Sequence, residues 1–117
     1  MGLSYFGPCF YCGVPSNTPD HVWPRSQGGR KTVPCCKECN VLLSAKTFST
    51  IEDRVGYLKC RLATRYRKAL ATPDWTDEEL GELGYNLRRK LRGRLILRGY
   101  IRERLAHIPS YELYDGA

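Results

Sequence analysis

Long apolar runs are absent from this sequence, and its first residues lack the pattern of an export signal. No stretch approaches the roughly 18 consecutive apolar residues that a membrane-spanning helix needs. Residues 1–9 contain neither a basic segment nor an apolar segment, so we expect no secretory signal peptide. We therefore predict no membrane partner and a cytoplasmic location, where reducing conditions make paired cysteines metal ligands rather than disulfides.

Acidic residues are few relative to basic ones, with 12 Asp and Glu against 19 Lys and Arg. A net charge of +7 is typical of proteins that meet phosphate groups, although charge alone does not identify a ligand. The charges are arranged in blocks, because residues 74–87 hold five acids and no bases and residues 88–104 hold eight bases and one acid. No internal repeat and no low-complexity tract is present.

The length of 117 residues allows one ordinary domain, or a compact core with a helical extension. Glycine, proline and cysteine are concentrated in the first third, where apolar runs are short. A module of that kind cannot bury a large core and needs disulfides or a metal to stabilise it. We predict an N-terminal module over residues 1–50 and a helical extension over residues 51–117, packed on the module or continuous with it.

The apolar pattern predicts two short strands and one helix in the N-terminal module. The strands are expected at residues 18–23 and 33–34, with a loop between them, and the helix at residues 37–46. Together with the helical extension, these elements predict an α+β protein with a ββα module.

Two amphipathic helices are predicted in the extension, at about residues 51–71 and 77–106. The first has an apolar face at steps of three and four residues, formed by Ile51, Val55, Leu58, Leu62, Tyr66 and Leu70. Ser49 or Thr50 is expected to cap it, and Thr76 with Glu79 forms a capping box before the second. The second continues one stripe, formed by Leu80, Leu83, Leu87, Leu91 and Leu95. Gly84, Gly93 and Gly99 each weaken this helix by about 1 kcal/mol relative to Ala, which allows a break.

Four of the six cysteines form two CxxC pairs with 23 residues between them. They are Cys9, Cys12, Cys36 and Cys39. Two residues between cysteines let both sulfurs of a tight turn face one ion, and two such turns supply the tetrahedral sulfur set that Zn²⁺ prefers. Gly13 fits the tight turn after the first pair. The spacing therefore predicts a structural zinc site.

The other two cysteines are interpreted differently. Cys35 is an alternative ligand to Cys36, but its spacing to Cys39 is poorer. Cys60 lies within a predicted helix, where a buried and inert thiol is expected.

The segment between the CxxC pairs carries a resemblance to a known family. It contains Asp20-His21-Val22-Trp23-Pro24-Arg25-Ser26-Gln27-Gly28-Gly29. Taken together, CxxCG, DHxxPxSxGG and CxxCN over residues 9–48 resemble the HNH (ββα-metal, His-Me finger) endonucleases that are common in phage genomes. The set is also similar to the phage recombination endonucleases that resolve branched DNA. The combination is more specific than any one piece. It implies a zinc-stapled HNH or treble-clef-like module, encoded by a phage and active in the host cytoplasm.

The resemblance implies a role for each of three residues. His21 matches the general base, Asp20 the acidic ligand of the catalytic divalent cation, and Asn40 the second ligand. Hydrolysis of a phosphodiester needs a base for water and a cation, here Mg²⁺ or Mn²⁺, that neutralises charge on the phosphate and the leaving oxygen. The implied activity is metal-dependent DNA endonuclease. An alternative role for Asp20 is to orient His21 through a hydrogen bond.

Two features of the motif need a structural explanation. Successive side chains on a strand point to opposite faces, so Asp20 and His21 can face one site only if the strand is distorted, and we expect a bulge there. The family's middle Asn has no counterpart, because residues 29–35 offer only Arg30, Lys31 or Thr32. That Asn holds the loop and orients the base, so its loss is expected to affect rate more than reaction class.

Basic residues near the motif and in the last predicted helix are candidate phosphate contacts. They are Arg25, Arg30, Lys31, Lys46, Arg88, Arg92 and Arg98. The basic stretch is also compatible with pairing to the acidic residues 74–82 of a second copy, which gives a homodimer through the extension. We expect DNA as the main partner, with phage packaging or recombination proteins as further ones. The alternative function is a non-catalytic zinc-binding DNA-binding or adaptor protein, which has no use for the Asp-His pair.

Overall fold

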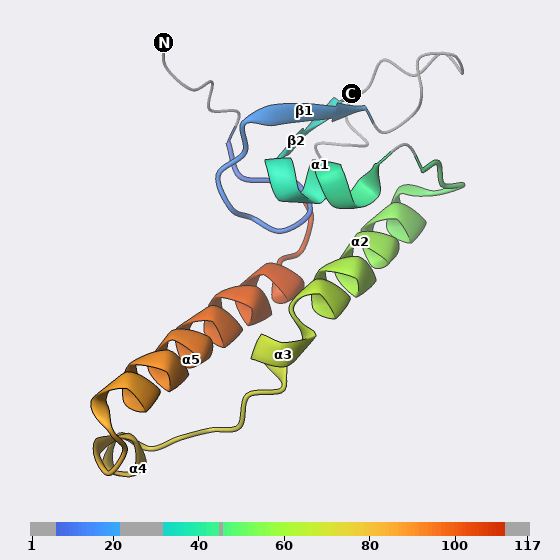
Figure 1. Cartoon of the computed structure of the whole chain (residues 1–117). Coiled ribbons are helices and arrows are strands. Elements are labelled where there is room, and N and C mark those ends of the chain that lie inside the picture. Colours follow the sequence, from blue (N-terminus) through green and yellow to red (C-terminus); the bar gives the residue numbers. More distant parts are fainter. Residues whose placement is uncertain (1–6, 22–31, 45, 112–117) are drawn as a thin grey trace.

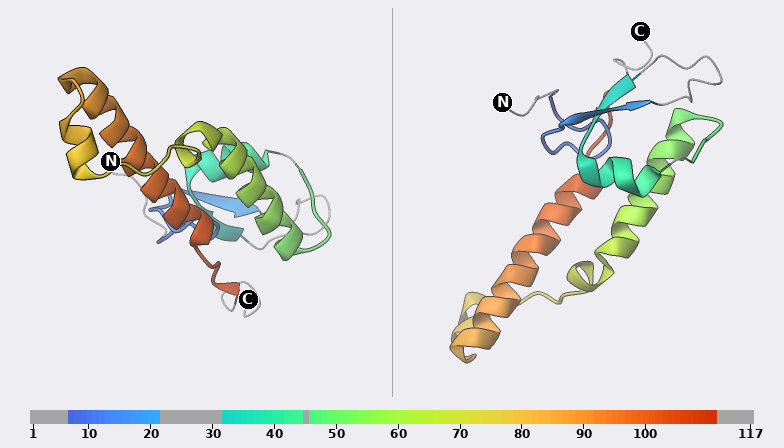
Figure 2. Two further views of the ribbon diagram at one scale, coloured as in Figure 1. Left: turned by 90° about the horizontal axis from the view of Figure 1, so that it is seen from below. Right: turned by 45° about the horizontal axis from the view of Figure 1, so that its top comes forward.

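A computed structural model of the chain describes residues 7–21, 32–44 and 46–111. Its elements are β1 (Thr18–His21), β2 (Thr32–Cys35), α1 (Lys37–Leu43), α2 (Ile51–Arg65), α3 (Arg67–Leu70), α4 (Asp77–Gly81) and α5 (Tyr85–Ala106). The two strands and α1 form an α+β module at one end, and α2 to α5 project from it as an arm (Figure 1). α5 packs against α2 and α3 and returns the chain to the module (Figure 2).

The two strands pair antiparallel, with Thr18 opposite Cys35 and His21 opposite Thr32. Each residue between them has a single partner, so the bulge expected at Asp20 and His21 is absent from the paired residues. Asp20 lies opposite Val33, and residues opposite one another share a face of the sheet. Both are buried, so the carboxylate of Asp20 faces the interior of the module. Val22 and Trp23 were predicted to extend this strand. Both lie outside the described residues.

The core of the module consists of cysteines and of apolar side chains from α1 and α2. Its fully buried members include Cys9, Tyr11, Cys35, Cys39, Leu43 and Leu58. The predicted apolar face of α2 is confirmed, since Ile51, Val55 and Leu62 are also buried. Thr50 begins this helix and accepts a hydrogen bond from the Asp53 amide at 3.0 Å. Side chains on one face of α2 therefore complete the core of the module.

The helical extension has four helices where the apolar pattern predicted two. Tyr66 leaves helical geometry, with φ −108° and ψ 25°, and separates α2 from α3. The capping box of Thr76 and Glu79 is confirmed at the start of α4. α4 is short, and Gly84 in extended conformation begins α5 as a separate helix. None of the helices in these described ranges is both long and apolar enough to cross a membrane.

The predicted stripe of the last helix is buried or half-buried except at Leu87, which is 51% exposed. Leu80 and Leu91, at other positions of the same stripe, are buried, so the face was predicted correctly. Leu87 is exposed because it lies in the first turn of α5, which Gly84 begins as a separate helix. The predicted position of Leu87 is therefore wrong.

Lys59 attaches α2 to the end of α5. Its ammonium donates to the carbonyl oxygens of Arg104, Leu105 and His107 at 3.1, 2.8 and 2.7 Å. The last carbonyls of a helix have no partner within it, so a lysine in this position acts as a C-terminal cap. Burial lowers the pKa of Lys59.

Gly13 allows the chain after α5 to approach the first CxxC turn. Its φ is +82°, and a Cβ at this position would lie 2.7 Å from Nδ1 of His107. Both the left-handed backbone and the close approach require glycine. Gly13, which was predicted to lie in a tight turn, therefore also lies where the module contacts the end of the extension.

Candidate metal centre and its surroundings

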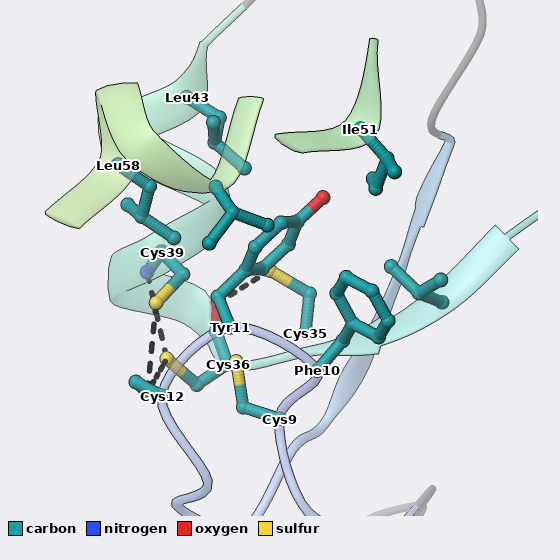
Figure 3. Packing of buried hydrophobic residues seen from close by; sticks show 12 residues of the cluster. Cys9, Phe10, Tyr11, Cys12, Cys35, Cys36, Cys39, Leu43, Ile51 and Leu58 are labelled. Atoms are coloured by element: carbon teal, nitrogen blue, oxygen red, sulfur yellow. Dashed lines mark hydrogen bonds between the residues drawn. The ribbon is translucent and has the colours of Figure 1, made fainter. Parts of the chain in front are cut away.

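The four cysteines of the two CxxC pairs, here called the cysteine quartet, lie together inside the module (Figure 3). Their sulfur atoms are all within 4.8 Å of one another, and all four residues are buried. Sγ of Cys12 lies 3.7 Å from that of Cys36 and 3.6 Å from that of Cys39. Four sulfurs at about 2.3 Å from one zinc ion are separated by about 3.8 Å. The quartet therefore has the composition and spacing to hold a zinc ion, as the sequence predicted.

Backbone hydrogen bonds place the two halves of the quartet. The amide of Gly13 donates to the Cys9 carbonyl at 2.9 Å and closes the first turn. Cys36 is the N-cap of α1, and its sulfur accepts from the amide of Cys39 at 3.5 Å. The amide of Phe10 donates to the Pro34 carbonyl at 2.8 Å, so the first turn is fixed to β2, which leads directly into Cys36.

The sulfurs of the quartet influence one another's pKa values. Hydrogen bonds with Cys36 and Cys39 lower the pKa of Cys12 to about 6. The hydrogen bond with Cys12 raises the pKa values of Cys36 and Cys39. Four thiolates at this spacing repel one another unless protons or a cation neutralise them. Such a group releases protons when it binds a metal ion.

The remaining two cysteines lie outside the quartet. The thiol of Cys35 is fully buried and donates to the carbonyl oxygen of Cys36 at 3.3 Å. Contact with Cys9 and burial raise the pKa of Cys35. Cys60 was expected to be buried, but it is exposed. That expectation is wrong because Leu58 and Leu62 face the core of the molecule, and a residue halfway between them lies on the opposite side of α2.

An arginine of α5 lies against the quartet. Nη2 of Arg104 is 3.8 Å from Sγ of Cys36 and 3.9 Å from Sγ of Cys39. Burial alone lowers the pKa of this guanidinium, but the hydrogen bond to Glu38 and the nearby sulfurs raise it above its ordinary value. Donors in the outer shell of a metal site orient the ligands and disperse their charge. Sequence reasoning counted Arg104 only as part of the basic stretch of residues 88–104, although it lies three residues after the buried Ile101.

Glu38, between the two cysteines of the second pair, connects the quartet to the extension. Its carboxylate accepts from Arg104 Nη1 at 2.6 Å and from the hydroxyl of Tyr66 at 2.5 Å, and Arg65 Nε forms an ion pair with it at 3.0 Å. Burial raises the pKa of Glu38, but these donors outweigh it and hold the pKa below its usual range. The end of α2 and the end of α5 are therefore both bound to the turn that carries Cys36 and Cys39.

Asp20, predicted as a ligand of a catalytic cation, is buried in an ion pair with Arg54 of α2. Arg54 Nη2 lies 2.9 Å from Oδ1 and 3.0 Å from Oδ2, and the hydroxyl of Tyr11 donates to Oδ2 at 2.5 Å. The exposed fractions of Asp20 and Arg54 are 4% and 3%. Burial and the charge of Asp20 raise the pKa of Tyr11. The sequence did not single out Arg54, although it precedes Val55 in the buried face of α2.

Two further residues belong to the predicted catalytic site. His21 ends β1, and its side chain lies outside the described residues. Asn40 directly follows Cys39 in α1 and is exposed. Within the part of the chain that the structure describes, the quartet is the group of Cys, His, Asp and Glu side chains that could share an ion, and Asp20 is not part of it.

The candidate phosphate contacts differ in their surroundings. Arg25, Arg30 and Lys31 lie outside the described residues. Lys46 is exposed, with Nζ 5.0 Å from the centre of the Tyr57 ring. Arg88 and Arg92 line a shallow groove on α5 together with Tyr85 and Ile96. These three cations remain candidates for phosphate contacts.

Arg98 has a different role from the one predicted. Its Nη1 donates to the carbonyl oxygen of Thr72 at 2.6 Å, and its Nη2 lies 2.6 Å from the carboxylate of Asp74. Its side chain is 13% exposed. Because this guanidinium holds the segment before α4 against α5, we no longer count it among the phosphate contacts.

The structure thus brings the quartet together and places Glu38 and Arg104 against it, but it puts Asp20 in a separate, charge-neutral pair with Arg54. In comparisons with known proteins, the chain matched no protein-family model, no curated protein and no solved structure. The residues and contacts described above are therefore the basis for a function.

Proposed function

We propose that this chain is a metal-dependent DNA endonuclease of the HNH type, with a structural zinc ion in the cysteine quartet. One observation carries the proposal. The quartet supports it, because it joins the first CxxC turn to the start of α1, so that Asn40 and the strand carrying Asp20 and His21 belong to one small module. Since β1 pairs without a bulge, the proposal requires the chain to turn at His21, the last residue of β1, for the base and the ligand to face one site. The order of two antiparallel strands and a helix also agrees with a ββα-metal module.

In this proposal His21 is the general base. Its neutral imidazole takes a proton from water while the water oxygen attacks the phosphorus, and the bond from phosphorus to O3′ breaks to leave 5′-phosphate and 3′-hydroxyl ends. Asp20 and Asn40 offer a carboxylate and an amide oxygen, the hard ligands that Mg²⁺ and Mn²⁺ prefer. When bound, the cation supplies neutralisation of charge on the phosphate and on O3′.

The donor set offers two oxygen ligands by residue type. One is the carboxylate of Asp20, which is paired with Arg54, and the other is the amide oxygen of Asn40. The side chain of Asn40 is exposed on α1 and is therefore accessible to a cation and to a phosphate. The exposed cations of Lys46 and Arg92, and the half-buried Arg88 beside Arg92, are proposed to contact the DNA backbone.

Cleavage of supercoiled plasmid, with and without Mg²⁺ or Mn²⁺, tests the proposal. We expect cation-dependent nicking or linearisation that a chelator stops. His21→Ala should slow cleavage by about 10² to 10⁴-fold, the usual contribution of a positioned base, with zinc content and DNA affinity unchanged. His107→Gln, at the other histidine of the chain, is the matched control and should cleave normally. Cleavage by His21→Ala within about threefold of wild type would exclude His21 as the base.

A second candidate function is a non-catalytic zinc-binding protein that binds DNA or acts as an adaptor. The burial of Asp20 in its pair with Arg54 favours it, because such a pair also serves simply to attach β1 to α2. This alternative predicts DNA or protein binding without cleavage at any concentration of Mg²⁺ or Mn²⁺. The plasmid experiment therefore separates the two functions.

A further inference from the structure

Exposed apolar side chains are concentrated on α5. Among the described residues, five of the seven large apolar side chains that are exposed belong to this helix: Tyr85, Leu87, Ile96, Leu97 and Tyr100. Beyond its contact with α4 at the tip of the arm, the side of α5 turned away from α2 and α3 has no other described helix beside it (Figure 1). Exposed apolar groups gathered on one element mark an interaction surface, whereas single scattered ones do not.

Four residues on this side form one face because of their spacing. Arg89 lies seven residues before Ile96, and Glu103 lies seven residues after it. Seven residues make almost two helical turns, so these three side chains point in one direction. Tyr85 lines a shallow groove together with Arg89 and Ile96 and continues the same face toward the start of the helix. Tyr85, Arg89, Ile96 and Glu103 are all exposed and are here called the outer face of α5.

The charges of the outer face are self-complementary in one orientation. Glu103 is the one acidic residue of α5, and within the described part of the chain neither Arg89 nor Glu103 has an ion-pair partner. If two copies of α5 lie antiparallel with Ile96 on a twofold axis, Arg89 of each copy lies opposite Glu103 of the other. A parallel pair would instead place like charges opposite each other, which is unfavourable. The antiparallel orientation is therefore favoured.

A hollow at the other end of α5 matches the same register. It has a volume of about 370 Å³ and is lined by residues 12–14 of the first CxxC turn and, among others, by Tyr100, Glu103 and His107. Tyr85 lies eleven residues before Ile96, and His107 lies eleven residues after it. The antiparallel pair therefore brings Tyr85 of one copy, which is 66% exposed, to the hollow of the other. A tyrosine suits such a place because its ring is apolar and its hydroxyl can stay in contact with water.

We propose that the outer face of α5 binds the same face of a second copy of the chain, in an antiparallel pair with Ile96 against Ile96 on the twofold axis. The two Arg89–Glu103 pairs determine the register, and Tyr85 of each copy enters the hollow of the other. Such a contact uses the same patch on both copies and closes as a dimer. Arg88 and Arg92 lie toward one edge of the outer face, so they stay accessible to DNA. The pairing does not depend on the proposed nuclease activity.

Sedimentation equilibrium of the zinc-loaded, full-length protein without DNA tests the pairing. The wild-type chain should form a dimer, and Ile96→Glu should weaken it by about a hundredfold or more, because two carboxylates then meet at the centre of the interface. Leu87→Glu is the matched control, since it introduces the same charge at an exposed leucine of α5. Leu87 lies nine residues before Ile96, which places it on the opposite side of the helix, so its dimer should be as strong as that of the wild type.

Charge reversal tests the register. Arg89→Glu and Glu103→Arg should each weaken the dimer by about tenfold or more, because like charges then face each other twice in the pair. The double variant, with both substitutions, restores opposite charges and should return to within about threefold of wild type. Both residues are exposed, so zinc content and circular dichroism should stay unchanged in all three variants. A double variant that remains as weak as the single ones would overturn the proposed register.

Three further results would overturn the proposal. One is a wild-type chain that stays monomeric up to about 100 µM, since its dimer would then be weaker than any specific interface. Another is a monomeric wild-type chain whose DNA affinity falls in Ile96→Glu, which would assign the outer face to DNA. The third is a dimer that dissociates when Arg88 and Arg92 are replaced by Gln but persists in Ile96→Glu, which would assign the interface to the acidic residues 74–82.

Discussion

Asp20, Arg54 and Arg104 are charged side chains buried almost completely in a chain of only 117 residues. A charge is tolerated in such a place only when a partner neutralises it and hydrogen bonds satisfy it. Arg54 is neutralised by Asp20, and Arg104 by Glu38 and the sulfurs beside it. Each buried arginine therefore marks a point where the helical extension is attached to the module.

Replacement of Cys36 by serine should unfold the N-terminal module, because metal-binding energy is folding energy in a core of this size. We expect loss of bound zinc and a smaller far-ultraviolet circular dichroism signal. Cys60→Ser is the matched control, since it removes an exposed thiol outside the quartet and should leave both unchanged. A Cys36→Ser protein with full zinc content would show that the quartet is not the zinc site.

Asn40→Ala should raise the Mn²⁺ concentration needed for half-maximal cleavage by roughly tenfold or more, because the cation loses an oxygen ligand. The measurement is a Mn²⁺ titration of plasmid cleavage at fixed protein concentration. Val41→Ala, at the next exposed residue of α1, is expected to titrate as wild type. Identical titrations for Asn40→Ala and wild type would count against Asn40 as a ligand.

The quartet was predictable from sequence because two residues between cysteines determine a local turn. Two such turns come together by binding one shared ion. The partners of the buried charges were not predictable in this way. Arg54 meets Asp20 across 34 residues of chain, and Arg104 meets Cys39 across 65. Contacts of that range depend on how α2 and α5 pack against the module, and neither spacing nor residue type encodes them.

At the scale of the elements, helix α2 agrees closely with the prediction from its sequence, whereas the 77–106 region does not. The apolar face and the N-terminal cap of α2 are both local patterns, and both are present. The break between α4 and α5 results from several weak preferences, among them Gly84, and no single residue imposes it. Periodicity therefore gave the right face, since Leu91 of the same stripe is buried, and failed at Leu87 in the first turn of α5.

Arg104→Met should detach α5 from the module. It removes the buried cationic partner of Glu38 and the guanidinium in contact with the sulfurs of Cys36 and Cys39. We therefore expect a loss of about 3 kcal/mol in unfolding free energy, at the lower end for buried pairs because Glu38 keeps some exposure. Urea denaturation measures this loss, and zinc transfer to a chelator should become faster as well. Arg102→Met, at an exposed arginine of the same helix, should change neither property.

Equal stability and equal zinc transfer in Arg104→Met and wild type would show that the contacts of Arg104 with Glu38, Cys36 and Cys39 do not couple the helix to the quartet. A stability loss without faster zinc transfer would restrict Arg104 to its ion pair with Glu38. The two measurements thus separate a role in packing from a role in the outer shell of the metal site.

At the scale of the whole molecule, acidic and basic residues occupy different parts of an elongated protein whose extents are 59 × 35 × 24 Å. Acidic α4 lies at the far end of the arm, and the basic first half of α5 begins beside it (Figure 1). Arg88 and Arg92 share a groove there with Tyr85 and Ile96, of which the last two are 66% and 74% exposed. A surface of cations with exposed apolar side chains suits either DNA or a second copy of the chain.

Neutralising Arg88 and Arg92 together distinguishes these two uses. Each phosphate contact contributes about −0.9 to the slope of log K against log salt, so replacing both residues with Gln should flatten the slope of DNA binding by about 1.8 if both meet phosphates. Cleavage at saturating protein should persist, because neither residue belongs to the proposed catalytic site. Arg98→Gln is the control, since it removes one charge that is already paired within the molecule and should lower stability without changing the slope. If the slope is unchanged, and sedimentation shows that the double substitution dissociates a dimer formed by the wild-type chain, Arg88 and Arg92 instead lie in an interface between copies. The acidic residues 74–82 are then their counterpart.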